Sequence, residues 1–289
     1  MGKYQIMLKM LKKRIIGAVI GTIIFMASVL SGCGNVNEAV THGTEKLGTV
    51  EAADLSASEL SARITPEPTP MPTPEPEPDM SPLPESWFDD AVFFGDSISV
   101  VLGKHAEKTG ELGKALFLCE FSYSVRNAVS GYLKIWYHGE QYLPQDVLGL
   151  TGATKVFTML GVNDVALPGG VDRTLECWAE YIAAIREKNP DIQIFIESCL
   201  PVYYEFSGRN NEMLDGYNER LRELCEETGC IYVDVAHYLK DENNKLALEY
   251  CSDMGEHITY EGAAVWAEQL KNPENYSVNP RSLEYGNHA

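Results

Sequence analysis

The feature that most constrains the fold is a regular alternation between short apolar runs and amphipathic segments. The runs are near-continuous in apolar residues, which is typical of strands buried on both faces of a parallel sheet. Five of them have the length of a strand: residues 91–94, 115–121, 155–160, 192–198 and 230–235. Helical patterns lie between them, and this alternation predicts an α/β protein whose parallel sheet is covered by helices on both sides.

Three helices can be placed from the spacing of their apolar residues. The first is expected from a cap at Asp172 to a stop before Pro190, and the second ends at Thr228-Gly229. Their apolar faces are formed by Leu175, Trp178, Ile182 and Ile185 in the first, and by Met213, Tyr217, Leu221 and Leu224 in the second. A last helix is expected from about Thr259 through Trp266 to Leu270.

The first apolar run ends abruptly in Gly95-Asp96-Ser97. Glycine permits a sharp turn, and an aspartate side chain can close that turn by hydrogen-bonding the backbone. The hydroxyl of Ser97 is then left at the carboxyl end of a buried strand, where open parallel sheets place their ligands. An ordinary strand-to-loop turn is the alternative interpretation, because Gly-Asp-Ser is a common tripeptide.

Two further loops carry polar residues of complementary types. Gly161-Val162-Asn163-Asp164 follows the third run, and Asp253-Met254-Gly255-Glu256-His257 precedes the last helix. A serine hydroxyl needs a base to become a nucleophile, histidine suits that task near pH 7, and a carboxylate can orient the histidine. An asparagine amide can donate to a developing oxyanion. The alternatives are a turn-capping Asn163 and a surface His257.

At these positions the sequence resembles the SGNH/GDSL hydrolases, over roughly residues 88–272. Phe94-Gly95-Asp96-Ser97 matches the first block of that family, and Gly161-Val162-Asn163-Asp164 matches its Gly-x-Asn-Asp block. Asp253 and His257 match its C-terminal Asp/His block. The resemblance implies a three-layer α/β/α sandwich with a five-stranded parallel sheet, flavodoxin-like in its winding.

The resemblance also implies roles for individual residues. Ser97 would be the nucleophile, His257 the base and Asp253 the carboxylate that orients the base. The oxyanion hole would consist of the Ser97 N–H, the Asn163 side chain and an N–H from a second block, which is usually a glycine. Neither a metal nor an organic cofactor is implied.

Two departures from the family pattern bear on these roles. Asp253 precedes His257 by four residues rather than the usual three, so Glu256, or no carboxylate, could orient the histidine instead. The segment 122–127 has no glycine where the second block is expected. A backbone N–H needs no particular side chain, and we assign that donor to Ser124, with Ser122 as the next choice.

The first 33 residues predict an export signal. Five basic residues precede an uncharged apolar stretch over residues 15–30, which is shorter than the roughly 20 residues of a membrane span. The stretch ends in Leu30-Ser31-Gly32-Cys33, which resembles a bacterial lipobox. Residues 1–32 are therefore interpreted as a lipoprotein signal peptide and Cys33 as the lipidated first residue of the mature chain. A plain signal peptide or an uncleaved anchor is the alternative.

Residues 33–85 are predicted to be a disordered tether. Its second half, residues 66–84, holds nine of the 15 prolines and would span roughly 60 Å as polyproline II. A proline-rich recognition motif is the alternative, but the interleaved glutamates favour a spacer. The hydrolase domain is expected over residues 86–277 and a tail over residues 278–289.

The charge of the chain argues against several classes of binding partner. Residues 1–32 hold five of the 23 basic residues and none of the 42 acidic ones, so the mature chain carries a net charge of −24. This charge argues against nucleic acid as a partner and against tight electrostatic binding to anionic lipid or teichoic-type polymers. A neutral substrate, such as an acylated glycan or small molecule, is expected, with membrane contact only through the lipid on Cys33.

Six cysteines follow Cys33, and none has the spacing of a zinc site. We expect them to be buried thiols, with Cys225 and Cys230 the one pair close enough in sequence to suggest a local disulfide. Four aromatic residues could line a sugar-binding cleft, although such residues more often belong to the core or its rim: Trp136, Tyr137, Tyr203 and Tyr204.

These observations together predict a monomeric, lipid-anchored, extracytoplasmic serine esterase. Its substrates would be O-acyl esters, with O-acetyl groups on glycans of the cell envelope as the expected case. A lipase or thioesterase of the same fold, and a non-catalytic binding lipoprotein, are the alternatives.

Overall fold

The computed structural model describes residues 77–205 and 208–283. The predicted signal peptide over residues 1–32, the lipidation site at Cys33 and the tether as far as residue 76 lie outside the described residues, as does the tail from residue 284. Among the residues that are described, none of the helices combines the length and apolar character needed to cross a membrane.

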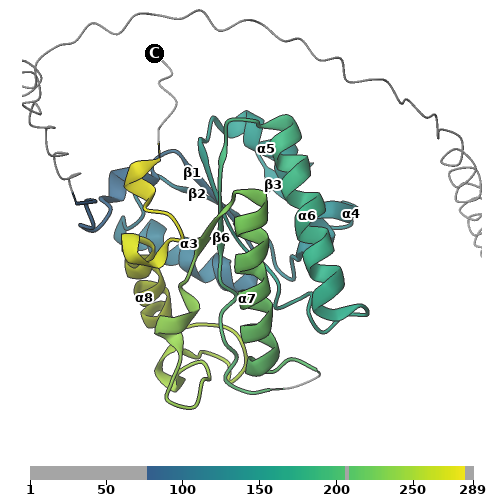
Figure 1. The fold of residues 1–289 in the computed structure, drawn as a ribbon, viewed down its shortest axis with the longest axis vertical. Coiled ribbons are helices and arrows are strands. Elements are labelled where there is room, and N and C mark those ends of the chain that lie inside the picture. Colours follow the sequence, from purple (N-terminus) through teal and green to yellow (C-terminus); the bar gives the residue numbers. More distant parts are fainter. Residues whose placement is uncertain (1–76, 206–207, 284–289) are drawn as a thin grey trace, which may run out of the picture. The chain divides into compact units, whose positions relative to one another are not determined.

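A five-stranded parallel sheet forms the centre of the domain (Figure 1). Its strands are β1 (Ala91–Gly95), β2 (Leu116–Cys119), β5 (Lys155–Met159), β6 (Gln193–Glu197) and β7 (Ile231–Val233). They are arranged in the order β2-β1-β5-β6-β7 and every neighbouring pair is parallel. The predicted α/β fold with a five-stranded parallel sheet is confirmed, and each predicted strand lies within two residues of an observed one at either end.

Helices cover both faces of this sheet. They are α3 (Ser97–Thr109), α4 (Val125–Ser130), α5 (Pro144–Thr151), α6 (Gly170–Lys188), α7 (Asn211–Thr228) and α8 (Tyr260–Leu270). Helices α3 and α8 pack together on one side, and α5, α6 and α7 lie on the other, as Figure 1 shows. Short 3₁₀ turns complete the domain: Glu85–Phe88, Ala236–Leu239, Leu248–Tyr250, Pro273–Asn275 and Pro280–Ser282.

A ladder of stacked phenylalanines sets the register of four strands. Phe93 pairs with Phe117 on one side and with Phe157 on the other, and Phe157 pairs with Phe195. The ring centroids of these three pairs lie 4.6, 4.7 and 4.4 Å apart. Because a slip of one residue would turn a side chain to the opposite face, this ladder holds the carboxyl ends of the strands level with one another.

The prediction was wrong about the start of one long helix and correct about the end of the other. Helix α6 starts at Gly170 with Gly169 as its cap, so the predicted cap at Asp172 is wrong; Asp172 lies in the first turn and pairs with Arg220. Helix α7 is capped by Asn210, whose side chain accepts a hydrogen bond from Met213 N at 2.7 Å. Its end at Thr228, followed by Gly229, agrees with the prediction.

A small hairpin between α4 and α5 was not predicted. It consists of β3 (Ile135–Tyr137) and β4 (Glu140–Tyr142), which pair antiparallel. Ile135 is buried, whereas Trp136 is exposed, and β3 lies against β2 at the edge of the main sheet.

The folded domain includes residues before the predicted boundary at residue 86 and after the predicted boundary at residue 277. Leu83 is buried and its N–H donates to Lys271 O at 2.7 Å. Arg281 donates to the carbonyl oxygens of Ser81 and Pro82 at 3.1 and 2.8 Å, so the two ends of the domain lie side by side.

Candidate active site

The first strand delivers Ser97 to the carboxyl edge of the sheet as the first residue of α3. A Cβ on Gly95 would lie 2.0 Å from Ser99 Oγ, so only glycine allows the helix to start this close to the strand. Asp96 caps the helix, because its Oδ1 accepts the N–H of Ile98 at 2.9 Å. The Ser97 side chain is partly exposed, and its own N–H has no acceptor among the described residues.

Asp96 is completely buried beneath Ser97. Burial raises its pKa to about 7, since the charged form loses its hydration. The hydrogen bond from Ile98 opposes this rise in pKa, while the negative charge of Glu256 adds to it. The second carboxylate oxygen of Asp96 accepts a hydrogen bond from Asn163 Nδ2 at 3.2 Å.

A continuous chain of polar contacts connects Ser97 to Asp253 through His257. His257 Nε2 lies 2.9 Å from Ser97 Oγ, and His257 Nδ1 lies 2.5 Å from Asp253 Oδ2. The imidazole therefore has an acceptor on one nitrogen and the serine hydroxyl on the other. This is the arrangement that lets a histidine take a proton from a serine.

Asp253 is held in place by the loop that it belongs to. Its Oδ1 accepts the N–H of Gly255 at 2.8 Å and the N–H of His257 at 3.3 Å, while its Oδ2 faces the ring. Partial burial alone would raise the pKa of Asp253, but the hydrogen bonds from His257 and Gly255 outweigh it and lower that pKa. The carboxylate is thus the stable form of this side chain.

The four-residue spacing between Asp253 and His257 is accommodated by one residue. Met254 adopts a left-handed conformation, with a φ of 62°, and its side chain is exposed. The extra residue therefore bulges outward, and Asp253 and His257, at the two ends of the loop, remain in contact. Glu256, which the sequence left open as an alternative partner of the histidine, instead forms an ion pair with Arg209.

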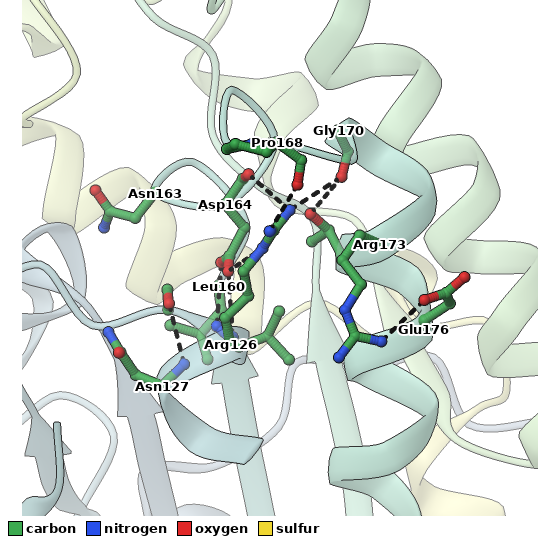
Figure 2. A network of polar contacts seen from close by, with 12 residues as sticks. Arg126, Asn127, Leu160, Asn163, Asp164, Pro168, Gly170, Arg173 and Glu176 are labelled. Atoms are coloured by element: carbon green, nitrogen blue, oxygen red, sulfur yellow. Dashed lines mark hydrogen bonds and ion pairs between the residues drawn. The ribbon is translucent and has the colours of Figure 1, made fainter. Parts of the chain in front are cut away.

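The side chain of Asn163, in the loop after β5, points toward the end of β1, where Asp96 and Ser97 lie. Its Nδ2 donates to Tyr123 O at 3.1 Å as well as to Asp96. The amide is therefore held between the end of β1 and the loop after β2, and Figure 2 shows it directed away from Asp164. An attacked carbonyl would have to replace one of these two acceptors in order to receive a hydrogen bond from Asn163.

Gly161, at the start of that loop, is needed for packing. It has a φ of 140°, and a Cβ there would lie 2.5 Å from the ring of Tyr217. Tyr217 is buried, donates to Leu160 O at 2.8 Å and accepts from Trp178 Nε1 at 2.6 Å. The tyrosine is thus fixed, and it leaves no room for a side chain at position 161.

Asp164 links the loop after β5 to the start of α4. It is fully buried and accepts the N–H groups of Val125 and Arg126 at 3.0 and 3.2 Å. Arg126 extends the link, because its guanidinium donates to Pro168 O at 2.9 Å and to Gly170 O at 3.4 Å (Figure 2). Sequence reasoning assigned no role to Asp164 or Arg126.

This link determines where Ser124 lies. Ser124 is the buried cap of α4, and its Oγ accepts the N–H of Asn127 at 3.2 Å. Its own N–H has no acceptor among the described residues, and it directly follows Tyr123, whose carbonyl holds Asn163. Ser122, the second choice from the sequence, is exposed and has a φ of 56°.

The loop after β6 is attached to the loop that carries His257. Tyr203 N donates to Gly255 O at 2.7 Å, and the ion pair between Arg209 and Glu256 joins the same two loops. Tyr203 is partly buried and Tyr204 is exposed beside them, whereas Trp136 and Tyr137 lie on the separate β3–β4 hairpin. Within residues 77–205 and 208–283, no group of three or more potential metal ligands is assembled.

Comparison with known proteins gives one family and several structures. The profile of the GDSL-like Lipase/Acylhydrolase family matches residues 93–265. No curated protein matches the sequence.

Three solved bacterial structures share the fold. A GDSL-like lipase from Bacteroides thetaiotaomicron is 18% identical with a TM-score of 0.51, and the match covers 65% of this chain and 88% of that one. A protein provisionally assigned as an acylhydrolase, from Bacteroides fragilis, is 17% identical with a TM-score of 0.51 over 62% and 83% of the two chains. A protein from Streptococcus pneumonia, provisionally assigned as a platelet activating factor, is 20% identical with a TM-score of 0.51 over 65% and 89%.

Proposed function

The chain belongs to the GDSL-like lipase/acylhydrolase family, and from that premise we propose that it is a serine esterase that removes short O-acyl groups from a glycan. The contact of His257 with both Ser97 and Asp253, at 2.9 and 2.5 Å, is the observation that carries this proposal. Hydrolysis of an ester needs a nucleophile, a base and an oriented carboxylate, and these three side chains supply them.

The reaction would proceed through a covalent acyl-enzyme. Ser97 Oγ attacks the ester carbonyl as His257 Nε2 takes its proton, and Asp253 stabilises the imidazolium that forms. The N–H groups of Ser97 and Ser124 and the amide of Asn163 are the donors for the oxyanion. His257 then returns the proton to the leaving alcohol, and a water molecule repeats the sequence to release the acid.

The openness of the site favours a large alcohol over a long acyl chain. The side chain of Asp253 is 42% exposed and that of His257 is 35% exposed, so the reacting groups lie near the surface. Phe121 and Tyr204, in the loops after β2 and β6, are 67% and 64% exposed. Exposed aromatic rings at the same edge of the sheet would provide the stacking surfaces that sugar rings use.

A lipase or thioesterase is the second candidate, and one observation favours it. Phe121, Leu167 and Met254 come from three different loops at the carboxyl edge of the sheet, and each exposes a large apolar side chain. Together they could accommodate an acyl chain at the surface. The two candidates share the catalytic residues and differ in the part of the substrate that is recognised.

The site would be exported and anchored through the lipid on Cys33, with the part of the predicted tether that precedes the folded domain as a spacer. The proposal rests on the lipobox-like Leu30-Ser31-Gly32-Cys33 and on the proline-rich composition that follows it. A monomer that requires no metal is the simplest form consistent with the three side chains of the site coming from one chain.

A panel of p-nitrophenyl esters tests the substrate class. The purified protein is expected to hydrolyse the acetate fastest and to lose kcat/KM steadily from butyrate to octanoate and palmitate. Release of acetate from an O-acetylated glycan should then exceed release from a deacetylated control treated in the same way. A rate that rises with acyl chain length would contradict the glycan esterase proposal and support the lipase.

A further inference from the structure

The end of α7 brings two cysteines together through its backbone. Cys230 N donates to Cys225 O at 2.9 Å, and Gly229, with a φ of 67°, forms the left-handed turn between them. This is the hydrogen bond of a Schellman motif, in which the side chain of the residue after the glycine frequently contacts that of the residue five positions before it. In most helices this contact is between apolar side chains, and here both positions are cysteine.

The geometry brings these two cysteines within reach of a disulfide. The hydrogen bond and the covalent bonds that connect it to the two Cα atoms would place these atoms at most about 7 Å apart if they lay in a straight line. The bond angles at the nitrogen and at the carbonyl make the actual separation of the Cα atoms shorter. Disulfides span Cα separations of about 4.4–6.8 Å. The cysteines are free thiols in this structure.

The two buried cysteines line one cavity. Cys225 and Cys230 both line a cavity of about 410 Å³ at the amino edge of the sheet, where β6 and β7 begin. Its walls include Ile194, Ile231 and Leu283. The reacting hydroxyl of Ser97 lies at the opposite, carboxyl edge, so chemistry at this cavity is separate from the active site.

The surroundings distinguish the two thiols. Arg186 Nη2 lies 3.5 Å from Cys230 Sγ, and a neighbouring guanidinium stabilises a thiolate. Burial raises the pKa of both thiols, but the Thr228 hydroxyl and Arg186 counteract that rise for Cys230, while Cys230 itself raises the pKa of Cys225 further. Cys230 is thus the more readily ionised of the two.

The other four cysteines of the described chain are placed differently. Cys119 is on β2, Cys177 on α6, Cys199 after β6 and Cys251 before α8. Each belongs to a separate element, whereas Cys225 and Cys230 share one turn.

We propose that Cys225 and Cys230 are a redox-active pair that an organic disulfide converts to an intramolecular disulfide, which ties the end of α7 to the start of β7. The Cys230 thiolate attacks one sulfur of the oxidant RSSR and releases RS⁻. Cys225 then loses its proton and attacks Cys230 Sγ, which releases the second RS⁻. The protein loses two electrons and two protons, and the oxidant becomes two thiols.

The pair can be followed in the unmodified protein. The purified protein is equilibrated in glutathione buffers of increasing oxidised fraction, quenched with acid, denatured and alkylated with N-ethylmaleimide. Trypsin releases peptide 223–240, which carries both cysteines, and peptide 174–186, which carries Cys177 alone. With oxidation, peptide 223–240 should pass from two alkyl groups to none, with a mass two hydrogens below the dithiol. Peptide 174–186 should stay alkylated and serves as the internal control.

Two outcomes would overturn the proposal: a doubly alkylated peptide 223–240 in every buffer, or one that carries glutathione and never the internal bond. The direction of attack has its own test. The Cys225→Ala variant should accumulate glutathione on Cys230, and the Cys230→Ala variant should accumulate far less on Cys225; equal labelling contradicts Cys230 as the attacking thiol. The oxidised protein should also have a higher Tm than the reduced one, and equal Tm values would contradict the tie between α7 and β7.

Discussion

His257 Nε2 lies 2.9 Å from Ser97 Oγ although 160 residues separate the two in the chain. The serine follows the first strand of the sheet, and the histidine precedes the last helix, which packs against the helix that begins at Ser97. The contact between α3 and α8 therefore brings the nucleophile and the base together. Any ester hydrolysis by this protein should depend on that one contact.

The first prediction tests the nucleophile. Ser97→Ala should reduce hydrolysis of p-nitrophenyl acetate by several powers of ten, because removing a member of a catalytic triad has that effect. Folding should be unchanged, since the hydroxyl is partly exposed and belongs to no core contact. The matched control is Ser130→Ala, another serine at a helix end, which should retain full activity. Comparable activity in the Ser97 variant would remove this residue from the mechanism.

The second prediction concerns Asp164, which contacts no reacting group. Asp164→Ala should lower kcat more than it raises KM, because the start of α4 loses its two hydrogen bonds and Ser124 N–H is no longer positioned. Stability should fall by about 2–4 kcal/mol, since the buried Val125 N–H and the partly buried Arg126 N–H lose their acceptor and the Arg126 guanidinium loses a neighbouring carboxylate. Kinetics and urea unfolding measure the two effects. The control Asp172→Ala removes an exposed carboxylate paired with Arg220 and should change neither kcat nor stability. A loss of stability with unchanged kcat in Asp164→Ala would mean that Asp164 has a structural role only.

Most of the sheet could be predicted from the sequence because its strands are short, continuous apolar runs. The aromatic residues Phe93, Phe117, Phe157 and Phe195 occur at matching places in four of these runs, which is why the register is so regular. The β3–β4 hairpin could not be found in this way. Its strands have three residues each, and only Ile135 among them is fully buried, so no apolar period marks them.

The candidate site residues could be named from the sequence because their blocks resemble those of a known family, but the residues that support them could not. Ser97, His257 and Asp253 are placed together by the structure, as the spacing of the loops suggested. The bonds from Asp164 to the start of α4, and the ion pair of Arg209 with Glu256, join segments 38 to 47 residues apart. Contacts over that distance depend on the fold and leave no local pattern.

The third prediction tests the location of the protein. Cys33→Ala should appear in the soluble fraction or remain as the unprocessed precursor, because no sulfur is present to receive the lipid. The measurement is membrane fractionation with a mass determination of the mature chain. Cys251→Ala, at a cysteine within the folded domain, should stay in the membrane fraction as wild type does. A Cys33 variant that is processed and anchored normally would remove the lipoprotein proposal and leave the esterase proposal unaffected.

The fourth prediction follows from a buried carboxyl group. Glu197, on β6, is almost completely buried and accepts a hydrogen bond from Trp266 Nε1 at 2.7 Å. Burial raises its pKa from 4.5 to about 8, only partly opposed by Trp266. The folded protein therefore keeps this proton where the unfolded chain has already lost it, so stability must fall as the pH rises from about 4.5 to about 8.

Glu197→Gln should remove this part of the pH dependence while keeping an acceptor for the Trp266 N–H. The variant should be more stable than wild type at pH 8 and above, by an amount on the order of a few kcal/mol. Urea unfolding at half-unit steps of pH measures the difference. A residual decline is expected from Asp96, whose pKa burial raises to about 7. The control Glu223→Gln removes an exposed carboxylate and should leave the profile unchanged; a Glu197 variant with the wild-type profile would contradict the buried proton.

The last prediction decides which carboxylate serves His257. Asp253 and Glu256 lie on the same loop, but only Asp253 reaches the imidazole, and Glu256 pairs with Arg209. Asp253→Asn should lower kcat strongly, by up to about four powers of ten where the wrong tautomer is favoured, and should alter KM far less. Glu256→Gln is the matched variant, because it also replaces one carboxylate by an amide three residues along the loop, and it should lower kcat less than tenfold. A large loss in both variants would mean that the ion pair with Arg209 positions the loop as strictly as Asp253 positions the ring. A small loss in Asp253→Asn would reduce the site to a serine–histidine dyad.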